Sequence, residues 1–130
     1  MGIFVNNSEY MYENTEDNVI TMPIKTLSDN ELEGIFENDT SLSGSLEFPF
    51  LTSIGNYAMQ NMFSGCTGLS GTVNFPSLTT VGTNGLNNTF NGCTGITAIH
   101  FKSSAQSVIQ SQASYATNFG APNATIYFDL

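Results

Sequence analysis

The sequence predicts an α/β repeat solenoid: a short array of about three 27-residue coils with a parallel sheet, an acidic N-terminal cap and a helix-plus-strand C-terminal cap. Sliding the chain by 27 residues aligns residues 36–55 with residues 63–82 at ten of twenty positions. A third copy opens at Phe90, where FNGCTGI matches the earlier FSGCTGL at five of seven positions. A fixed period of this length is typical of units that bury their apolar faces by stacking on their neighbours. The 130 residues then form one domain, divided into an N-terminal cap (1–18), repeats (19–102) and a C-terminal cap (103–130).

The first part of the chain is expected to be a cap followed by a partial repeat. Residues 1–18 are acidic and rich in asparagine, with apolar runs at 3–5 and 10–12. From residue 20 the segment ITMP resembles LEFP, which begins at residue 46. Leu27, Leu32 and Ile35 also precede apolar residues of the next copy by 27 positions. The array therefore has roughly three and a half turns. Stacking is expected to align Phe36, Phe63 and Phe90 as one buried ladder, with Leu42, Leu69 and Ile96 beside it.

Alternation of apolar and polar residues predicts one strand in each repeat. The three segments end at Pro49, Pro76 and Lys102, and they are Leu46-Glu47-Phe48, Val73-Asn74-Phe75 and Ile99-His100-Phe101. Between strands, apolar residues over 51–63 recur every three or four positions, which suits a short helix. Gly55 and Asn56 interrupt that pattern, so irregular turns that pack their apolar residues inward fit equally well.

The C-terminal part predicts a helix and a strand. Residues 103–112 open with Ser103, a residue suited to cap a helix N-terminus, and continue with helix-tolerant residues. The segment GAPN at 120–123 then breaks the helix. A strand is expected over 124–130, with Ile126, Phe128 and Leu130 on one face.

The repeat units resemble the BspA-like branch of the leucine-rich repeats. The resemblance covers about residues 20–102 and rests on an isoleucine- or valine-glycine turn (Ile54-Gly55, Val81-Gly82) followed by FSGCTGL (63–69) and FNGCTGI (90–96). It implies a leucine-rich-repeat-like solenoid used for adhesion and protein binding. It also implies a setting on bacterial surfaces, in secreted protist proteins or in bacteriophages, and no catalytic residues.

Composition and charge exclude several classes of function. Charged residues make up 10% of the chain, the net charge is −9, and ten of the eleven carboxylates lie between Glu9 and Glu47. With Lys25 and Lys102 as the only lysines or arginines, binding to nucleic-acid phosphates or to an anionic membrane is excluded, whereas a basic partner is compatible. We expect no membrane insertion, because no window approaches eighteen apolar residues. Without a signal-peptide pattern, the expected location is cytoplasmic or virion-associated, with surface exposure as the alternative.

Two surfaces are candidates for binding a protein partner. Stacking aligns the outward strand positions into a polar face formed by Thr21, Asn74 and His100 with Glu47, Ser45 and Thr72. The second candidate is an acidic patch formed by Glu31, Glu33, Glu37, Asp39 and Glu47. The acidic end is favoured for an intracellular partner, because ten acids against Lys25 over residues 1–47 make the strongest field on the chain.

The cysteines and the single histidine are the remaining candidates for chemistry. Stacking places the Cα atoms of Cys66 and Cys93 about 4.8 Å apart, within disulfide range. Side chains with the same direction on stacked coils rarely reach the disulfide dihedral, so two reduced, buried thiols are expected. His100 has only Glu47 as a possible second metal ligand, and no catalytic triad or carboxylate pair is evident. We therefore expect no enzyme activity, no metal and no cofactor.

Three hypotheses for function follow. The first is a non-enzymatic protein-binding module, encoded by a phage or a gut bacterium, that binds and in some cases inhibits one protein partner. The second is an adhesive or structural component of a virion or cell surface. The third is an acidic mimic of nucleic acid that blocks the basic groove of a nucleic-acid enzyme. The sequence indicates no oligomeric state.

Overall fold

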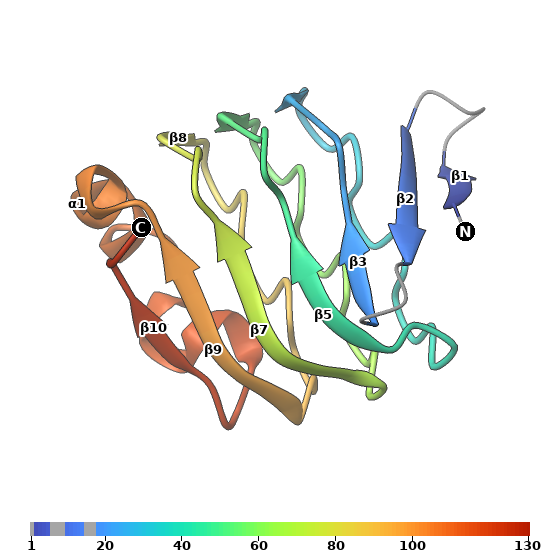
Figure 1. Cartoon of the computed structure of the whole chain (residues 1–130). Coiled ribbons are helices and arrows are strands. Elements are labelled where there is room, and N and C mark those ends of the chain that lie inside the picture. The colour runs from blue at the N-terminus through green and yellow to red at the C-terminus, as the bar shows by residue number, and fades with distance from the viewer. Residues whose placement is uncertain (1, 6–9, 15–17) are drawn as a thin grey trace.

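The strands stack side by side in a repeat-like parallel arrangement, with β1 at one end and α1 with β10 at the other (Figure 1). This computed structural model describes the backbone of residues 2–5, 10–14 and 18–130 and the side chains of residues 18–130. In the described part of the chain the only α-helix, α1 (Gln106–Gln110), has five residues. The α/β class predicted from the sequence is therefore wrong, and the fold is mostly β.

A seven-stranded sheet, the large sheet, contains the predicted strands. Its strand order is β1 (Gly2–Val5), β2 (Tyr10–Asn14), β3 (Val19–Thr21), β5 (Gly44–Glu47), β7 (Leu69–Phe75), β9 (Gly95–Phe101) and β10 (Thr125–Tyr127). The five strands from β3 to β10 are parallel, and β1 and β2 extend the sheet antiparallel. In its register Ile20 pairs with Leu46 and Leu46 with Val73, as the repeat alignment predicts.

A second, smaller parallel sheet was not predicted. It consists of three two-residue strands, β4 (Thr26–Leu27), β6 (Ser53–Ile54) and β8 (Thr80–Val81). Leu27 pairs with Ile54 and Ile54 with Val81, so this sheet keeps the 27-residue register. Strands of two residues are too short to show the alternation by which strands are recognised in a sequence.

Turns, not helices, connect the small sheet to the large one. We call these segments ribbon 1 (28–39), ribbon 2 (55–66) and ribbon 3 (82–93). In each ribbon every second N–H donates to the carbonyl three residues earlier, as Gln60 N–H does to Tyr57 O at 3.2 Å. In ribbons 1 and 2 the N–H groups between them donate to the next ribbon, as Met59 N–H does to Gly85 O at 3.0 Å. Because half of the N–H groups bond outside their own ribbon, no helix forms over 51–63.

Residues with positive φ recur every four positions along the ribbons. They form three columns with a spacing of 27 residues, Asn30/Tyr57/Asn84, Gly34/Asn61/Asn88 and Asn38/Gly65/Gly92. Glycine has no Cβ penalty in this conformation, and asparagine tolerates it better than most residues. The Asn and Gly residues that interrupt a helical pattern in the sequence therefore specify the ribbon.

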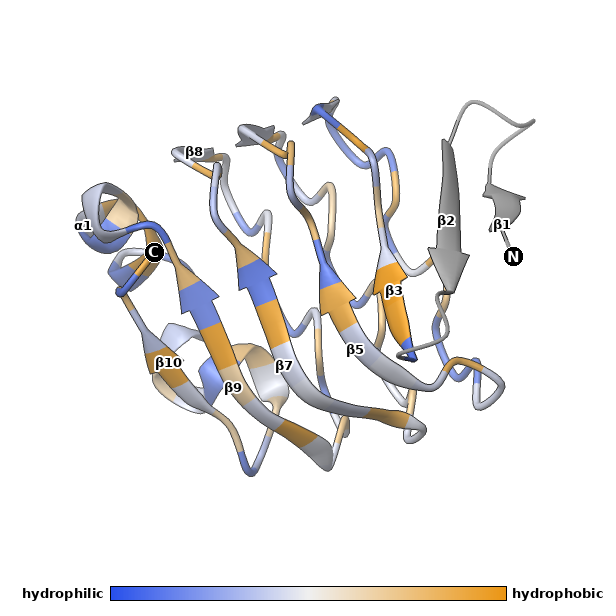
Figure 2. Cartoon of the chain, viewed as in Figure 1, coloured by the Kyte–Doolittle hydropathy of each residue, from blue (hydrophilic) through white to orange (hydrophobic). Residues whose placement is uncertain are grey.

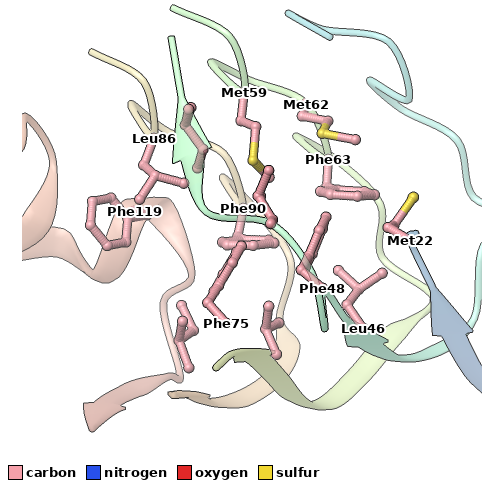
Figure 3. Close-up of a cluster of buried hydrophobic side chains, with 14 of the residues drawn as sticks. Met22, Leu46, Phe48, Met59, Met62, Phe63, Phe75, Leu86, Phe90 and Phe119 are labelled. Atoms are coloured by element: carbon pink, nitrogen blue, oxygen red, sulfur yellow. The ribbon is translucent and has the colours of Figure 1, made fainter. Parts of the chain in front are cut away.

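The core is built from side chains that repeat from coil to coil (Figure 3). Phe63 stacks on Phe36 and on Phe90, with ring centroids 5.6 and 5.8 Å apart, which confirms the predicted ladder. A second ladder joins Phe75 to Phe48 and Phe101 at 4.7 and 5.2 Å. Leu42, Leu69 and Ile96 are buried beside the first ladder, as predicted. Ile35 differs from its equivalent Met62: it is 36% exposed, whereas Met62 lies between two other ribbons and is buried.

The C-terminal segment covers the last coil with short elements. A 3-10 turn, η1 (Ser103–Ala105), leads into α1, and a second 3-10 segment, η2 (Tyr115–Gly120), follows it. Ser103 does not cap the helix, because the N-cap residue of α1 is Ala105 and no side chain caps it. The final strand is shorter than predicted, and Ile126 and Phe128 pack on the core while Leu130 is 43% exposed.

Candidate functional site

The predicted polar face of the large sheet is present as one continuous row. Thr21 pairs with Glu47, Glu47 with Asn74, and Asn74 with His100. The hydrophilic ends of β7 and β9 lie side by side in Figure 2. All four side chains are partly exposed. We call these four residues, together with Tyr127, the sheet-face row.

Tyr127 is the member of the row that the sequence analysis missed. It pairs with His100 across β9 and β10, and its side chain is 43% exposed. The two rings stack with centroids 4.9 Å apart and an interplanar angle of 14°. The 27-residue period could have identified Tyr127, because it follows His100 by 27 residues even though the surrounding sequences differ.

Hydrogen bonds hold the side chains of the row in place. Asn74 Nδ2 donates to Glu47 Oε1 at 2.8 Å. His100 Nδ1 and Asp129 Oδ1 also lie 2.8 Å apart. The carboxylate beside His100 is thus that of Asp129, which follows β10, whereas the Glu47 carboxylate accepts a hydrogen bond from Asn74. The expectation that only Glu47 could act as a second metal ligand beside His100 is therefore wrong.

The predicted acidic patch divides between two parts of the molecule. Glu31, Glu33, Glu37 and Asp39 lie on ribbon 1, whereas Glu47 lies on β5 in the large sheet. Among the four carboxylates nearest the N-terminus, Glu9, Glu16 and Asp17 lie outside the described residues, and only the backbone of Glu13 is described. Ribbon 1 also carries Asp29, which is exposed.

Several carboxylates of ribbon 1 have structural partners. Glu33 accepts hydrogen bonds from Asn30 Nδ2 and from Gln60 Nε2 at 2.8 and 2.9 Å. Gln60 Oε1 in turn accepts from Asn87 Nδ2 at 3.1 Å, so a polar ladder crosses all three ribbons.

A second ladder of the same kind starts at Asp29. Asp29 Oδ1 accepts from Asn56 N–H, and Asn56 Oδ1 accepts from Thr83 N–H, both at 2.8 Å. In both ladders the carboxylate is the first member. The side-chain amides of Gln60 and Asn87 follow in the first ladder, and the Asn56 amide and the Thr83 backbone N–H follow in the second. The acidic residues of ribbon 1 thus help to hold ribbon 2 in register.

The two cysteines are free and buried, as predicted. The Cys66 thiol donates to Phe36 O at 3.0 Å and the Cys93 thiol to Phe63 O at 3.1 Å. Burial raises the pKa of Cys66 from 9.0 to about 11 and that of Cys93 to about 12. Thiols held in the protonated form are poor nucleophiles and poor metal ligands.

Other kinds of site have little support in the described residues. Between residues 18 and 130 no three acidic, histidine or cysteine side chains come together as a metal-binding group. Among the described segments, no helix has the length and apolar character to cross a membrane.

Comparisons with protein families, with curated proteins and with solved structures gave no match for this chain.

Proposed function

We propose that this chain is a non-enzymatic protein-binding module and that the sheet-face row is its contact surface. The observation that carries the proposal is the row itself: five residues on five adjacent parallel strands in register. Four of these strands are hydrogen-bonded to a neighbouring strand on each side, and the fifth, β10, is hydrogen-bonded to β9. This pairing holds the backbone of the row in a fixed arrangement.

Preorganised side chains favour binding. The Asn74 amide is tied to Glu47 and the His100 ring to Asp129 and Tyr127, so little rotamer freedom remains to be lost in a complex. Tyrosine is also among the residues that contribute most to protein interfaces. The resemblance of the repeats to BspA-like leucine-rich repeats supports the same role, in a phage or bacterial-surface setting, with adhesion as the related alternative.

A partner-capture experiment tests the proposal. The immobilised protein is exposed to lysates of gut bacteria and their phages, and retained proteins are identified by mass spectrometry. We expect the partner to be lost with Asn74→Trp/His100→Trp, and Tyr127→Ala to weaken binding at least tenfold, as for a central aromatic contact. A partner retained unchanged by both variants would show that the sheet-face row is not the contact.

The acidic ribbon is the competing contact surface. Ribbon 1 exposes three carboxylates at four-residue spacing, those of Asp29, Glu33 and Glu37, and few basic residues lie near them in the sequence. A surface of this charge would be complementary to a basic groove on a partner. The matched variant replaces Glu31, Glu33 and Glu37 by Gln and Asp39 by Asn. Loss of the partner in this variant alone, with binding that weakens steeply as salt rises, would assign the contact to ribbon 1 and favour the nucleic-acid mimic.

A further inference from the structure

The large sheet ends in an open strand edge on its C-terminal side. Within the described part of the chain β10 pairs with β9 alone, and it is the outermost strand on that side of the sheet in Figure 1. Thr125 and Tyr127 are exposed, and Ile126 is partly exposed. Proteins usually protect such edges with lysine, proline or a covering segment. Residues 124–128 contain neither lysine nor proline, so the edge is free to pair with another strand.

The register shows which backbone groups of β10 face the open side. Successive residues of a strand direct their N–H and C=O groups to opposite sides. Asn74 O points back toward the preceding coil, where it accepts from Phe48 N–H at 3.0 Å. Tyr127 occupies the equivalent position in β10, so its backbone groups face β9. The N–H and C=O groups of Ile126 and Phe128 therefore face outward.

Two stacks of aromatic rings also end at this edge. On the inner face of the sheet, Phe128 continues the ladder of Phe75 and Phe101, with its ring centroid 6.0 Å from that of Phe101. On the outer face Tyr127 stacks on His100. Among the described residues, Phe101 is the one ring stacked on Phe128, and His100 is the one ring stacked on Tyr127. Both stacks thus stop at the edge where the hydrogen-bonded strands stop.

The C-terminal end of the molecule is almost without charge. Residues 103–128, which include η1, α1, η2 and β10, contain no acidic or basic side chain. Asp129 follows them, and its carboxylate lies 2.8 Å from His100. Few charges together with aromatic residues are characteristic of the core of an interface between identical subunits. Two copies that meet through this end also keep their acidic segments, which contain ten carboxylates between Glu9 and Glu47, away from each other.

We propose that two copies of this chain pair through the open edges of β10, antiparallel and about a two-fold axis at Tyr127. Ile126 then lies opposite Phe128 of the other copy and exchanges two backbone hydrogen bonds with it. The two Tyr127 residues face each other at a position without such bonds, where the side chains of an antiparallel pair lie closest. The large sheet becomes continuous across the dimer, and the two sheet-face rows join into one.

Sedimentation equilibrium of the full chain tests the proposal. Over a concentration series we expect monomer and dimer and no larger species, because a symmetric pair uses both open edges. Tyr127→Lys places two like charges opposite each other and should weaken association by about tenfold or more. Phe50→Lys is the matched control, since Phe50 is exposed in the turn after β5, and it should leave association unchanged. A monomer at every concentration, a larger assembly, or equal effects of both substitutions would overturn the proposal.

Single cysteine substitutions test the register of the pairing. Tyr127→Cys places two new thiols opposite each other, so this variant should form an intermolecular disulfide under mild oxidation. Thr125→Cys is the control: Thr125 lies opposite Asp129 of the other copy, so its two thiols are about 13 Å apart along the strands and should stay reduced. Cys66 and Cys93 are buried.

Non-reducing electrophoresis compares the two cysteine variants. Equal cross-linking in both, or none in either, would contradict the proposed pairing. Both experiments use the protein without a binding partner, so the dimer can fail while the sheet-face row remains a contact surface, and the reverse.

Discussion

Aromatic side chains in the core stack on the equivalent residues of the neighbouring coils. Phe63 contacts Phe36 on one side and Phe90 on the other, and it has no exposed surface. A stacked aromatic pair contributes about 0.5–1.5 kcal/mol beyond the burial of its area. Removing a middle ring therefore removes two stacking contacts and leaves a cavity that neither neighbour can fill.

Replacement of Phe63 measures this effect. Phe63→Ala should lower the free energy of unfolding by about 3–5 kcal/mol, as expected for a buried aromatic side chain. Phe50→Ala is the matched control, since Phe50 is 54% exposed, and it should change the free energy by less than about 0.5 kcal/mol. Urea unfolding monitored by circular dichroism gives both values. Equal effects of the two substitutions would contradict the ladder.

The buried thiols make stability depend on alkaline pH. In the unfolded chain Cys66 and Cys93 lose their protons near pH 9, whereas burial holds their folded-state pKa values at about 11 and about 12. The stabilisation is complete below pH 9 and is lost as the pH rises from there toward 11–12. The free energy of unfolding should fall by up to about 1.4 kcal/mol per pH unit for each thiol.

Urea titrations between pH 8 and 11 check this dependence. The double variant Cys66→Ala/Cys93→Ala should show a shallower decline, because the remaining decline comes from other groups. In the folded wild-type protein neither thiol should react with iodoacetamide at pH 8, and both should react after denaturation. An identical pH profile in wild type and double variant would show that the thiols do not titrate as their burial requires.

The elements differ in how well the sequence predicts them. The strands β5, β7 and β9 were predictable because Leu46, Val73 and Ile99 repeat in an alternating context. The ribbons resemble a broken helix in sequence, because their apolar residues also recur every three to four positions. The four-residue spacing of asparagine and glycine, as in Asn84, Asn88 and Gly92, distinguishes the two, since each of these residues has positive φ.

The candidate site was predictable only as far as the repeats extend. Glu47, Asn74 and His100 occupy equivalent positions, so their alignment follows from the period. The contact of Asp129 with His100 depends on β10, whose sequence does not resemble the other strands. The cleft between residues 81–84 and residues 111–113 was not predictable either, because residues 111–113 do not follow the path of the ribbons.

Substitution at Asn61 tests the ribbon conformation. Asn61 has a φ of 56°, and its side chain makes no hydrogen bond with the described residues. Asn61→Ala should lower the free energy of unfolding by about 1 kcal/mol, because a Cβ without a compensating polar group is disfavoured there. Asn61→Gly should leave the free energy unchanged or raise it slightly. Thermal unfolding ranks the variants, and an alanine variant as stable as the glycine variant would contradict the assigned conformation.

Over the whole molecule, charge is distributed unevenly. The carboxylates of ribbon 1 lie at one end of the array, and the chain from residue 48 to residue 128 contains no Asp or Glu. Repulsion within such a cluster opposes folding at low ionic strength. Glu33 offsets part of it through the hydrogen bonds of its carboxylate, whereas the exposed carboxylate of Glu37 has no hydrogen bond within the described part of the chain.

Two substitutions separate repulsion from hydrogen bonding. Glu37→Gln should raise the free energy of unfolding by less than about 1 kcal/mol at low salt, and the gain should disappear in 1 M NaCl, where charges are screened over about 3 Å. Glu33→Gln should lower it at every salt concentration, because the new amide faces the amide donors of Asn30 and Gln60. Denaturant titrations at the two salt concentrations measure both. A salt-independent gain in Glu37→Gln would show that repulsion is not its cause.

The 27-residue register also sets how a gene for such a chain can change length. Residues 55–81 begin and end at equivalent points, so a tandem duplication of this stretch inserts one coil without altering the sequences that form either terminus. Each inserted coil lengthens the array by about 4.8 Å and adds one position to every outward row. Unequal recombination at this period would therefore change the length of the sheet in steps of one coil, and the residues at the two ends of the array would stay the same.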